Sequence, residues 1–133
     1  MTFFNKFSLF QYSVEEIAKK CGEYAHCREW KQGVLTNSTK QFKGVVRIPD
    51  CIVLLSTHDN LLEKHWGIHD AAKMRVPTVG IVDSNMDPRL VSYPIPGNDD
   101  SPQSVLYIAG LFSKLITTVK RKRENFFTNL AQK

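Results

Sequence analysis

The chain has 133 residues, of which 42% are hydrophobic, and a formal net charge of +5. This length suits a single domain over residues 1–133 and excludes an array of several domains. The composition excludes a chain that is disordered throughout, and no apolar run approaches the roughly 20 residues of a membrane-spanning helix. Lysine and arginine outnumber aspartate and glutamate by 18 to 13, which favours an anionic partner, nucleic acid first.

The first half of the chain predicts one helix and one long loop. Apolar residues recur at helical spacing from Val14 to Ala25, and a capping box begins at Ser13, so we expect a helix over 13–26. Residues 27–48 show no hydrophobic period and contain two glycines. This second stretch predicts a basic loop.

The second half predicts a strand, a helix and a strand in succession. The apolar runs "CIVLL" (51–55) and "TVGIV" (78–82) predict two strands buried on both faces, with a helix around 61–75 between them. A short strand over 90–95 and a final helix from 102 to 120 or beyond follow. Because strands joined by a helix pair in parallel, the predicted class is α/β, a parallel sheet flanked by helices.

The stretch "YPIPGNDDSP" (93–102) holds three prolines, a glycine and two adjacent aspartates. Ser101 before Pro102 is typical of a helix start, because serine caps the first amide groups and proline fits the first turn. Asp99 and Asp100 would then lie where the helix dipole stabilises negative charge. We interpret the stretch as a structural loop formed by Pro94, Pro96, Gly97, Asn98, Asp99, Asp100, Ser101 and Pro102.

The same acids leave an enzymatic alternative open. Enzymes of the α/β class place their sites at the carboxyl ends of parallel strands, so Asp83, Asp99 and Asp100 would serve a metal-dependent hydrolase. A calcium loop of the EF-hand type starting at 83–87 fails, because its sixth position is Pro88 rather than glycine. Binding of Mg²⁺ or Mn²⁺ would separate the hydrolase from a structural loop.

Histidines and cysteines add little chemistry. His65 and His69 lie four residues apart, as in zinc motifs, but Trp66 replaces the glutamate of that motif, so we expect surface histidines and no metal. His26 and Cys27 are not expected to form a catalytic pair, because neighbours on a helix point in different directions. No glycine-rich phosphate-binding motif follows a strand, so no cofactor is expected.

The cations concentrate in two regions, the loop 27–48 and the basic helix end 120–133. The loop also carries aromatic and polar side chains of the kinds that stack on bases or hydrogen-bond to phosphate. Structured RNA, recognised through its backbone and shape, is the partner that this pattern favours. The predicted RNA-binding residues are Arg28, Trp30, Lys31, Asn37, Lys40, Lys43, Arg47, Lys120, Arg121, Lys122 and Arg123.

The chain contains, in this order, the segments "CGEYAHCREW" with "GVLTN", "IPDCIVLLSTH", "HDAAKMRVPTVGIVDSNMDP" and "YPIPGNDDSP". These segments resemble small-subunit ribosomal protein two, the S-two family, and its animal mitochondrial members in particular. The resemblance implies a non-enzymatic constituent of the mitochondrial small ribosomal subunit, in the matrix, with a Rossmann-like sheet and no cofactor. The implied partners are small-subunit ribosomal RNA and neighbouring ribosomal proteins, with no membrane, no small-molecule substrate and no homo-oligomer.

The chain also departs from the pattern of that family. Members of that family normally begin with a further N-terminal segment, and "TFFNK" resembles the tail of its central strand; another chain supplies that segment, the assembly covers the gap, or the sequence is an incomplete version. The long helical hairpin that bacterial members carry before "CIVLL" is replaced here by a short stretch, as in mitochondrial members. We therefore expect an exposed sheet edge at "CIVLL" or its neighbour, and a chain that is not stable alone. In the loop, the family's "RYWRGG" reads "REWKQG", so that Glu29 replaces an aromatic residue and Gln32 a glycine.

Overall fold

A five-stranded parallel sheet with the strand order β2-β1-β3-β6-β7 forms the centre of the fold. The computed structural model describes residues 1–4, 11–44, 47–60 and 63–131. The strands are β1 (Thr2–Phe4), β2 (Tyr24–His26), β3 (Ile52–Leu54), β6 (Thr78–Val82) and β7 (Tyr93–Pro96). The predicted α/β class with a parallel sheet is confirmed.

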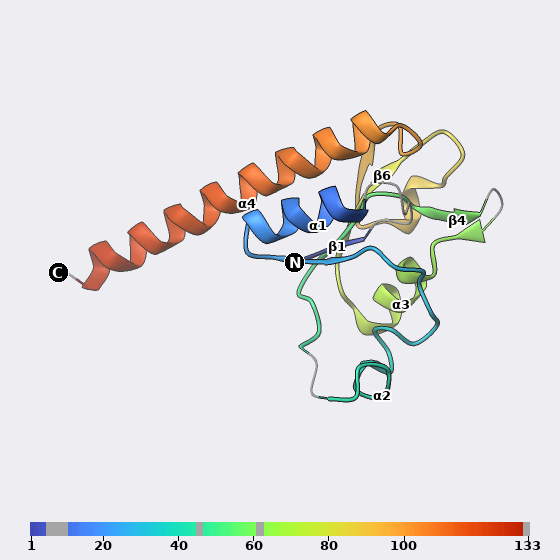
Figure 1. Ribbon diagram of the computed structural model, residues 1–133, viewed down its shortest axis with the longest axis horizontal. Helices are drawn as coiled ribbons and strands as arrows, with labels where there is room; N and C mark the ends of the chain where they lie inside the picture. The colour runs from blue at the N-terminus through green and yellow to red at the C-terminus, as the bar shows by residue number, and fades with distance from the viewer. Residues whose placement is uncertain (5–10, 45–46, 61–62, 132–133) are drawn as a thin grey trace.

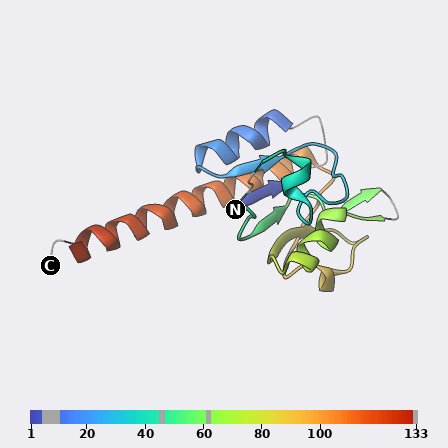
Figure 2. The ribbon, with the colours of Figure 1, turned by 90° about the horizontal axis from the view of Figure 1, so that it is seen from below.

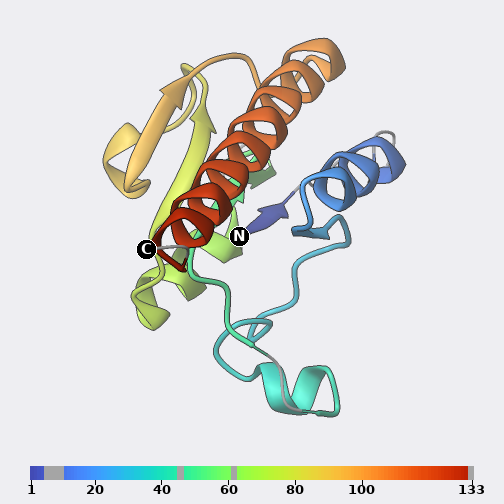
Figure 3. The same cartoon turned by 90° about the vertical axis from the view of Figure 1, so that its left-hand side faces the viewer.

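Helices cover both faces of this sheet. α1 (Gln11–Lys20) and α4 (Pro102–Ala131) lie side by side on one face, and α3 (Trp66–Met74) lies on the other (Figure 1 and Figure 3). The remaining elements are the short helix α2 (Ser38–Gln41), the antiparallel pair β4 (His58–Asn60) and β5 (Glu63–Lys64), and the 3-10 turn η2 (Pro88–Leu90). No helix in the described part of the chain has an apolar stretch long enough to cross a bilayer.

The residues of β3 divide the core into two halves. Ile52 and Leu54 belong to the cluster on the α3 side together with Ala71, whereas Val53 belongs to the cluster under α1 and α4 together with Val105. Each of these five side chains is at most 1% exposed. Burying a side chain as large as valine or leucine contributes about 1.5–3 kcal/mol, which is why a strand covered on both faces has an unbroken apolar run.

β3 has a neighbour on each side. Val53 lies opposite Phe3 of β1 and opposite Val79 of β6. The expectation of an exposed edge at "CIVLL" is therefore wrong, and the edges of the sheet are β2 and β7. In β7, Pro94 and Pro96 lack an N–H group, which limits further strand pairing at that edge. The stability of the isolated chain stays a prediction.

The first helix is shorter than predicted. α1 begins at Gln11, so Ser13 lies inside the helix rather than at its start, and α1 ends at Lys20. Gly22 adopts a φ of +67°, the left-handed conformation that commonly ends helices. Tyr24–His26, which the pattern placed in the helix, instead pair with β1.

The helix predicted around 61–75 is also shorter. Glu63–Lys64 form β5, opposite β4, and residues 61–62 lie outside the described part of the chain. The helix that follows, α3, spans Trp66–Met74. Arg75 closes it in the left-handed conformation, and its N–H group bonds back to the last turn.

The other predicted elements are confirmed, with one shifted boundary. β6 covers the whole of "TVGIV", and β3 lies within "CIVLL". The strand predicted over 90–95 is β7, which is shifted to Tyr93–Pro96 because Pro88–Leu90 form the turn η2. α4 begins at Pro102 as predicted and continues to Ala131.

Candidate nucleic-acid interface

One buried carboxylate fastens the basic loop to the domain. Asp70 of α3 is 2% exposed. It accepts hydrogen bonds from the indole Nε1–H of Trp30 at 3.2 Å and from the backbone N–H of Gly33 at 3.3 Å. Val34 and Leu35 come next and are buried in the core cluster on the α3 side. The buried side chains of Trp30, Val34 and Leu35 and the carboxylate of Asp70 thus attach the loop to this face of the domain.

Trp30 belongs to the interior of the protein. Its side chain is 7% exposed, and its ring lies edge-to-face against His26 and His65, with centroids 5.5 and 5.6 Å apart. A base cannot stack on a ring in this position. The interpretation of Trp30 as an RNA contact therefore does not fit the structure, which gives this residue the role of shaping the loop.

The sequence "KQG" keeps glycine at the position that requires it. Gly33 has a φ of +91°, in the left-handed region, and its amide group donates to Asp70. Gln32 is not among the described residues with positive φ, and its carbonyl accepts from Nε2 of Gln41 at 3.2 Å. The replacement of a family glycine by Gln32 therefore causes no backbone strain.

The outer side of the loop carries cations. Residues 28–29, 31–32, 36–37 and 39–44 are exposed, and α2 projects away from the rest of the domain (Figure 1 and Figure 3). Exposed lysine and arginine attract phosphates whatever the base sequence. The exposed members of the predicted set in this loop are Arg28, Lys31, Asn37, Lys40, Lys43 and Arg47.

A cavity of about 770 Å³ lies between this loop and α4. Phe42 and Arg47 line it from the loop, and Lys120 and Arg123 line it from the helix. Arg47 also forms an exposed ion pair with Asp50, at 3.2 Å. Such a pair contributes about 0–1 kcal/mol, so a phosphate can replace Asp50 at little cost. The cavity brings the two predicted basic regions to one side of the molecule.

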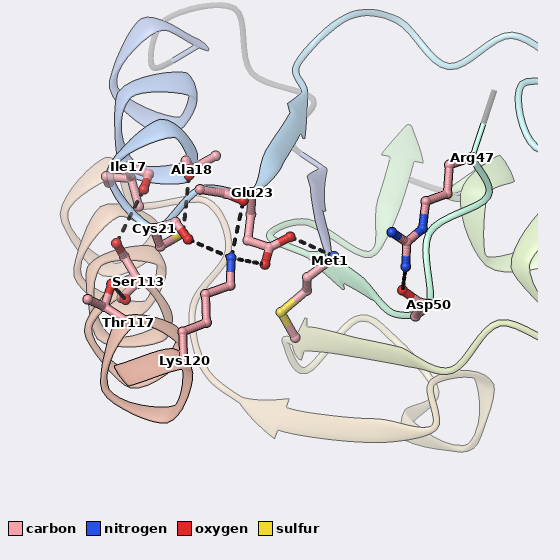
Figure 4. Close-up of polar contacts among 11 residues, drawn as sticks. Met1, Ile17, Ala18, Cys21, Glu23, Arg47, Asp50, Ser113, Thr117 and Lys120 are labelled. Atoms are coloured by element: carbon pink, nitrogen blue, oxygen red, sulfur yellow. Dashed lines mark hydrogen bonds and ion pairs between the residues drawn. The ribbon is translucent and has the colours of Figure 1, made fainter. Parts of the chain in front are cut away.

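Lys120, the first cation of the run 120–123, makes its contacts within the domain (Figure 4). Nζ of Lys120 lies 2.6 Å from Oε1 of Glu23 and donates to the carbonyls of Cys21 at 2.9 Å and Gly22 at 3.2 Å. These carbonyls follow the last turn of α1, where helices leave acceptors without an internal partner. The structure thus makes Lys120 a fastener between α4 and α1, which does not fit its predicted contact with RNA.

Arg121, Lys122 and Arg123 are exposed. Successive residues of a helix point about 100° apart, so the three cations face different sides of α4. Arg123 is the one that lines the cavity. A single RNA surface would therefore meet only part of this run.

Glu23 gives the junction of α1 and α4 a pH dependence. Burial raises the pKa of this carboxyl, but hydrogen bonds from Lys120 and from the amino group of Met1 outweigh burial, so the pKa lies below its usual 4.5. A carboxyl whose pKa is lowered by folding stabilises the folded state above its unfolded pKa, and this contribution disappears as the pH falls through the folded pKa. We expect the free energy of unfolding, measured by urea titration, to decrease as the pH falls below 4.5 and to decrease less in Glu23→Gln. Equal pH slopes in the two proteins would contradict this role.

Cys27 and His26 lack the properties of a catalytic pair. Burial raises the pKa of the Cys27 thiol to about 12, with a further contribution from Glu15. Burial lowers the pKa of His26, and the nearby charge of Arg28 lowers it further. A thiol that stays protonated at neutral pH is a poor nucleophile, so this pair offers no thiolate for chemistry.

Polar side chains hold the proline-rich corner in shape. Oδ1 of Asn98 accepts from the backbone N–H of Asp100 at 2.8 Å. Asp99 is fully buried and accepts from Oγ of Ser56 at 3.2 Å and from the backbone N–H of Thr57 at 3.4 Å. The expectation that Asp99 faces the first amide groups of α4 is therefore wrong, since this acid fastens the corner to the segment after β3. The contacts support a structural loop.

The acids of the hydrolase alternative do lie together. Asp83, Asp99 and Asp100 each place a carboxylate oxygen within 4.8 Å of the others, at the carboxyl edge of the sheet. Asp83 accepts a hydrogen bond from the backbone N–H of Ser84 at 2.6 Å. Asp99 accepts one from Oγ of Ser56, which fastens the proline-rich corner. These bonds give two of the acids a structural role, and a cluster of acids is not by itself evidence for a hydrolase.

His65 is not the surface histidine that the pattern suggested. It is 5% exposed and precedes α3, where its Nδ1 accepts from the backbone N–H of Gly67 at 3.0 Å. His69 is exposed and lies edge-to-face with Trp66, with ring centroids 6.0 Å apart. The ring of His65 thus serves as a helix cap rather than as half of a metal site.

Sequence reasoning missed two acids that shape the interface, Asp70 and Glu23. The partner of Asp70 is Trp30, 40 residues away, and the partner of Glu23 is Lys120. For Asp70 the helical pattern carries no signal, because a residue two positions from Ile68 points to a different side of the helix. For Glu23 the local sequence carries no signal either.

Sequence comparison relates this chain to proteins with known names. The family model for Ribosomal protein S2 matches residues 38–118, which is more than half of the chain. The chain belongs to the ribosomal protein S2 family. The matched residues begin at α2 and include most of α4, so they cover the sheet strands β3, β6 and β7 and the second half of the loop.

Relatives in this S2 family support the mitochondrial type. The Bos taurus small ribosomal subunit protein uS2m is 48% identical over 114 residues, and that of Schizosaccharomyces pombe is 36% identical over 115 residues. Each match covers 86% of this chain, which spans 39% and 41% of the two relatives. The Dictyoglomus turgidum small ribosomal subunit protein uS2 is 27% identical over 157 residues, covering 86% of this chain and 62% of the relative. The predicted resemblance to mitochondrial members is confirmed.

The alignment lengths also bear on the missing hairpin. An equal share of this chain, 86%, aligns over 114 residues with the bovine protein and over 157 residues with the bacterial one. The bacterial relative therefore holds additional residues within the matched region. This is the result expected for an S2 protein without the long insertion of bacterial members.

Proposed function

We propose that this chain is a structural, RNA-binding constituent of the mitochondrial small ribosomal subunit. The observation that carries the proposal is the row of exposed cations on a loop that Asp70 fastens to the domain, in a family whose relatives are named small ribosomal subunit proteins. Cations held in this way neutralise phosphates and release counterions. They need no reacting group and no bound cofactor.

The proposal includes the matrix of the mitochondrion as location, and ribosomal RNA and neighbouring ribosomal proteins as partners. It includes no catalysis, no small-molecule substrate, no contact with membranes and no homo-oligomer. Trp30 and Lys120 are left out of the proposed contacts because the structure engages both within the domain. The proposed RNA-binding residues are Arg28, Lys31, Asn37, Lys40, Lys43, Arg47, Arg121, Lys122 and Arg123.

Sedimentation of the tagged chain from mitochondrial extracts tests this function. We expect the chain to travel with the small subunit in a sucrose gradient and to move towards the top after ribonuclease digestion. A chain that stays near the top in untreated extracts would contradict the proposal.

Calorimetric titration with Mg²⁺ or Mn²⁺ tests the hydrolase alternative, with Asp83→Asn as the matched variant. We expect no binding heat that depends on Asp83, because its carboxylate already accepts from Ser84. Metal binding that disappears in the variant, together with hydrolytic turnover, would favour the enzyme.

A further inference from the structure

The last part of α4 extends beyond the domain and carries apolar side chains. Near the start of the helix, Val105 and Ala109 are fully buried. Beyond Lys120, which contacts the end of α1, every residue from 121 to 130 is exposed. Figure 1 and Figure 2 show this part of the helix running past the rest of the fold. A helix end of this kind would normally be polar on all sides.

Four large apolar residues form a line along this helix, which we call the apolar row: Leu115, Val119, Phe126 and Leu130. Their side chains are 61%, 62%, 61% and 54% exposed. Their spacing of four and seven residues places them on one side of the helix. Phe127 lies beside Phe126, edge-to-face at 5.9 Å, and is 60% exposed. Contiguous exposed apolar surface marks a site of association.

Cations border the apolar row on both sides. With about 100° between successive residues, Lys122 falls on one side of the row and Arg123 on the other. Glu124, the acid of this segment, falls on the far side of the helix. The surface is therefore an apolar line with a positive rim.

We propose that the apolar row is the docking surface for another protein, whose contacting surface is an apolar groove with an acidic rim. Charge complementarity carries this assignment, because carboxylates beside the groove would pair with Lys122 and Arg123. A second copy of this chain would bring like charges together along the same line. An RNA duplex would satisfy the cations but leave Phe126 and its neighbours against a polar backbone. The inference rests on the proposed function and extends it by naming the surface and the chemistry of one neighbour, and it assigns Lys122 and Arg123 to that protein in place of RNA.

Photo-crosslinking in mitochondria tests the docking surface. Benzoylphenylalanine replaces Phe126 in one variant and Tyr107 in the control, because Tyr107 is a similarly exposed aromatic residue on another side of α4, 68% against 61%. We expect several-fold more product from position 126. The product should hold a peptide of one protein with aspartate or glutamate beside apolar residues. Equal yields, adducts on RNA, or a product of two copies of this chain would overturn the proposal.

A charge reversal tests the rim separately. Lys122→Glu together with Arg123→Glu is expected to reduce the yield from position 126 several-fold, and an unchanged yield would overturn the acidic rim. Sedimentation of the same extracts distinguishes failure of the docking surface from failure of the proposed ribosomal function. A protein crosslink in a chain that does not travel with the small subunit supports the docking surface and contradicts the ribosomal function. An RNA adduct in a chain that does travel with it contradicts the docking surface alone.

Discussion

Replacing Asp70 by alanine is expected to lower the free energy of unfolding by about 3 kcal/mol. The carboxylate is 2% exposed and accepts from Nε1 of Trp30 and the backbone N–H of Gly33, so its loss leaves two buried donors without this acceptor. Because both donors belong to the basic loop, the loop is also expected to leave the face of α3. Urea unfolding gives the energy, and proteolysis of the native protein between residues 28 and 44 reports the release of the loop.

Two variants control for this result. Asp70→Asn keeps an oxygen acceptor of the same size and is expected to cost less than the alanine variant. Asp50→Ala removes an acid whose ion pair with Arg47 is exposed, 78% for the aspartate side chain, and is expected to change stability by about 1 kcal/mol or less. If Asp70→Ala were no more destabilised than Asp50→Ala, Asp70 would not hold the loop.

Replacing Lys31, Lys40 and Lys43 together by glutamine is expected to weaken binding to small-subunit ribosomal RNA by roughly ten-fold or more. The three side chains are exposed on the outer side of the loop, so the fold is expected to remain intact. The plot of log affinity against log salt should become shallower by about 2–3, since each lost phosphate contact contributes about 0.9. Filter binding of the full chain at several salt concentrations measures both quantities.

A charge-matched triple variant separates local contacts from net charge. Lys19, Lys73 and Lys114 are exposed residues of α1, α3 and α4, away from the basic loop in sequence. Their replacement by glutamine lowers the net charge by the same amount. We expect a smaller loss of affinity and a smaller change of slope than in the loop variant. Equal losses in the two variants would mean that the loop has no special role and that only total charge matters.

The parts of the fold that the sequence predicts best are those buried on both faces. β3 and β6 lie in unbroken apolar runs of the sequence. Because a helix connects them, the sequence predicts that the two strands pair in parallel, as they do. β2 is the opposite case. Tyr24–His26 continue the helical spacing of α1, but Gly22 ends the helix and β1 supplies a pairing partner from the start of the chain. A three-residue strand of this kind exists only because of that distant partner.

The same distinction applies to the candidate interface. The exposure of Lys31, Lys40 and Lys43 follows from their charge, since lysine is almost never fully buried. The residue types of Trp30 and Lys120 place both among the predicted RNA contacts, but in the structure both face acids elsewhere in the chain. Nothing within a few residues of either one indicates these partners. Contacts between such distant positions require the three-dimensional structure.

Ultraviolet crosslinking of purified mitochondrial small subunits, followed by mass spectrometry of peptides with nucleotide adducts, tests the central claim most directly. Peptides of this chain should be present, with adducts concentrated between Arg28 and Arg47, where the loop carries its exposed cations. Absence of the chain from the subunits, or adducts confined to segments outside the two basic regions, would contradict the account.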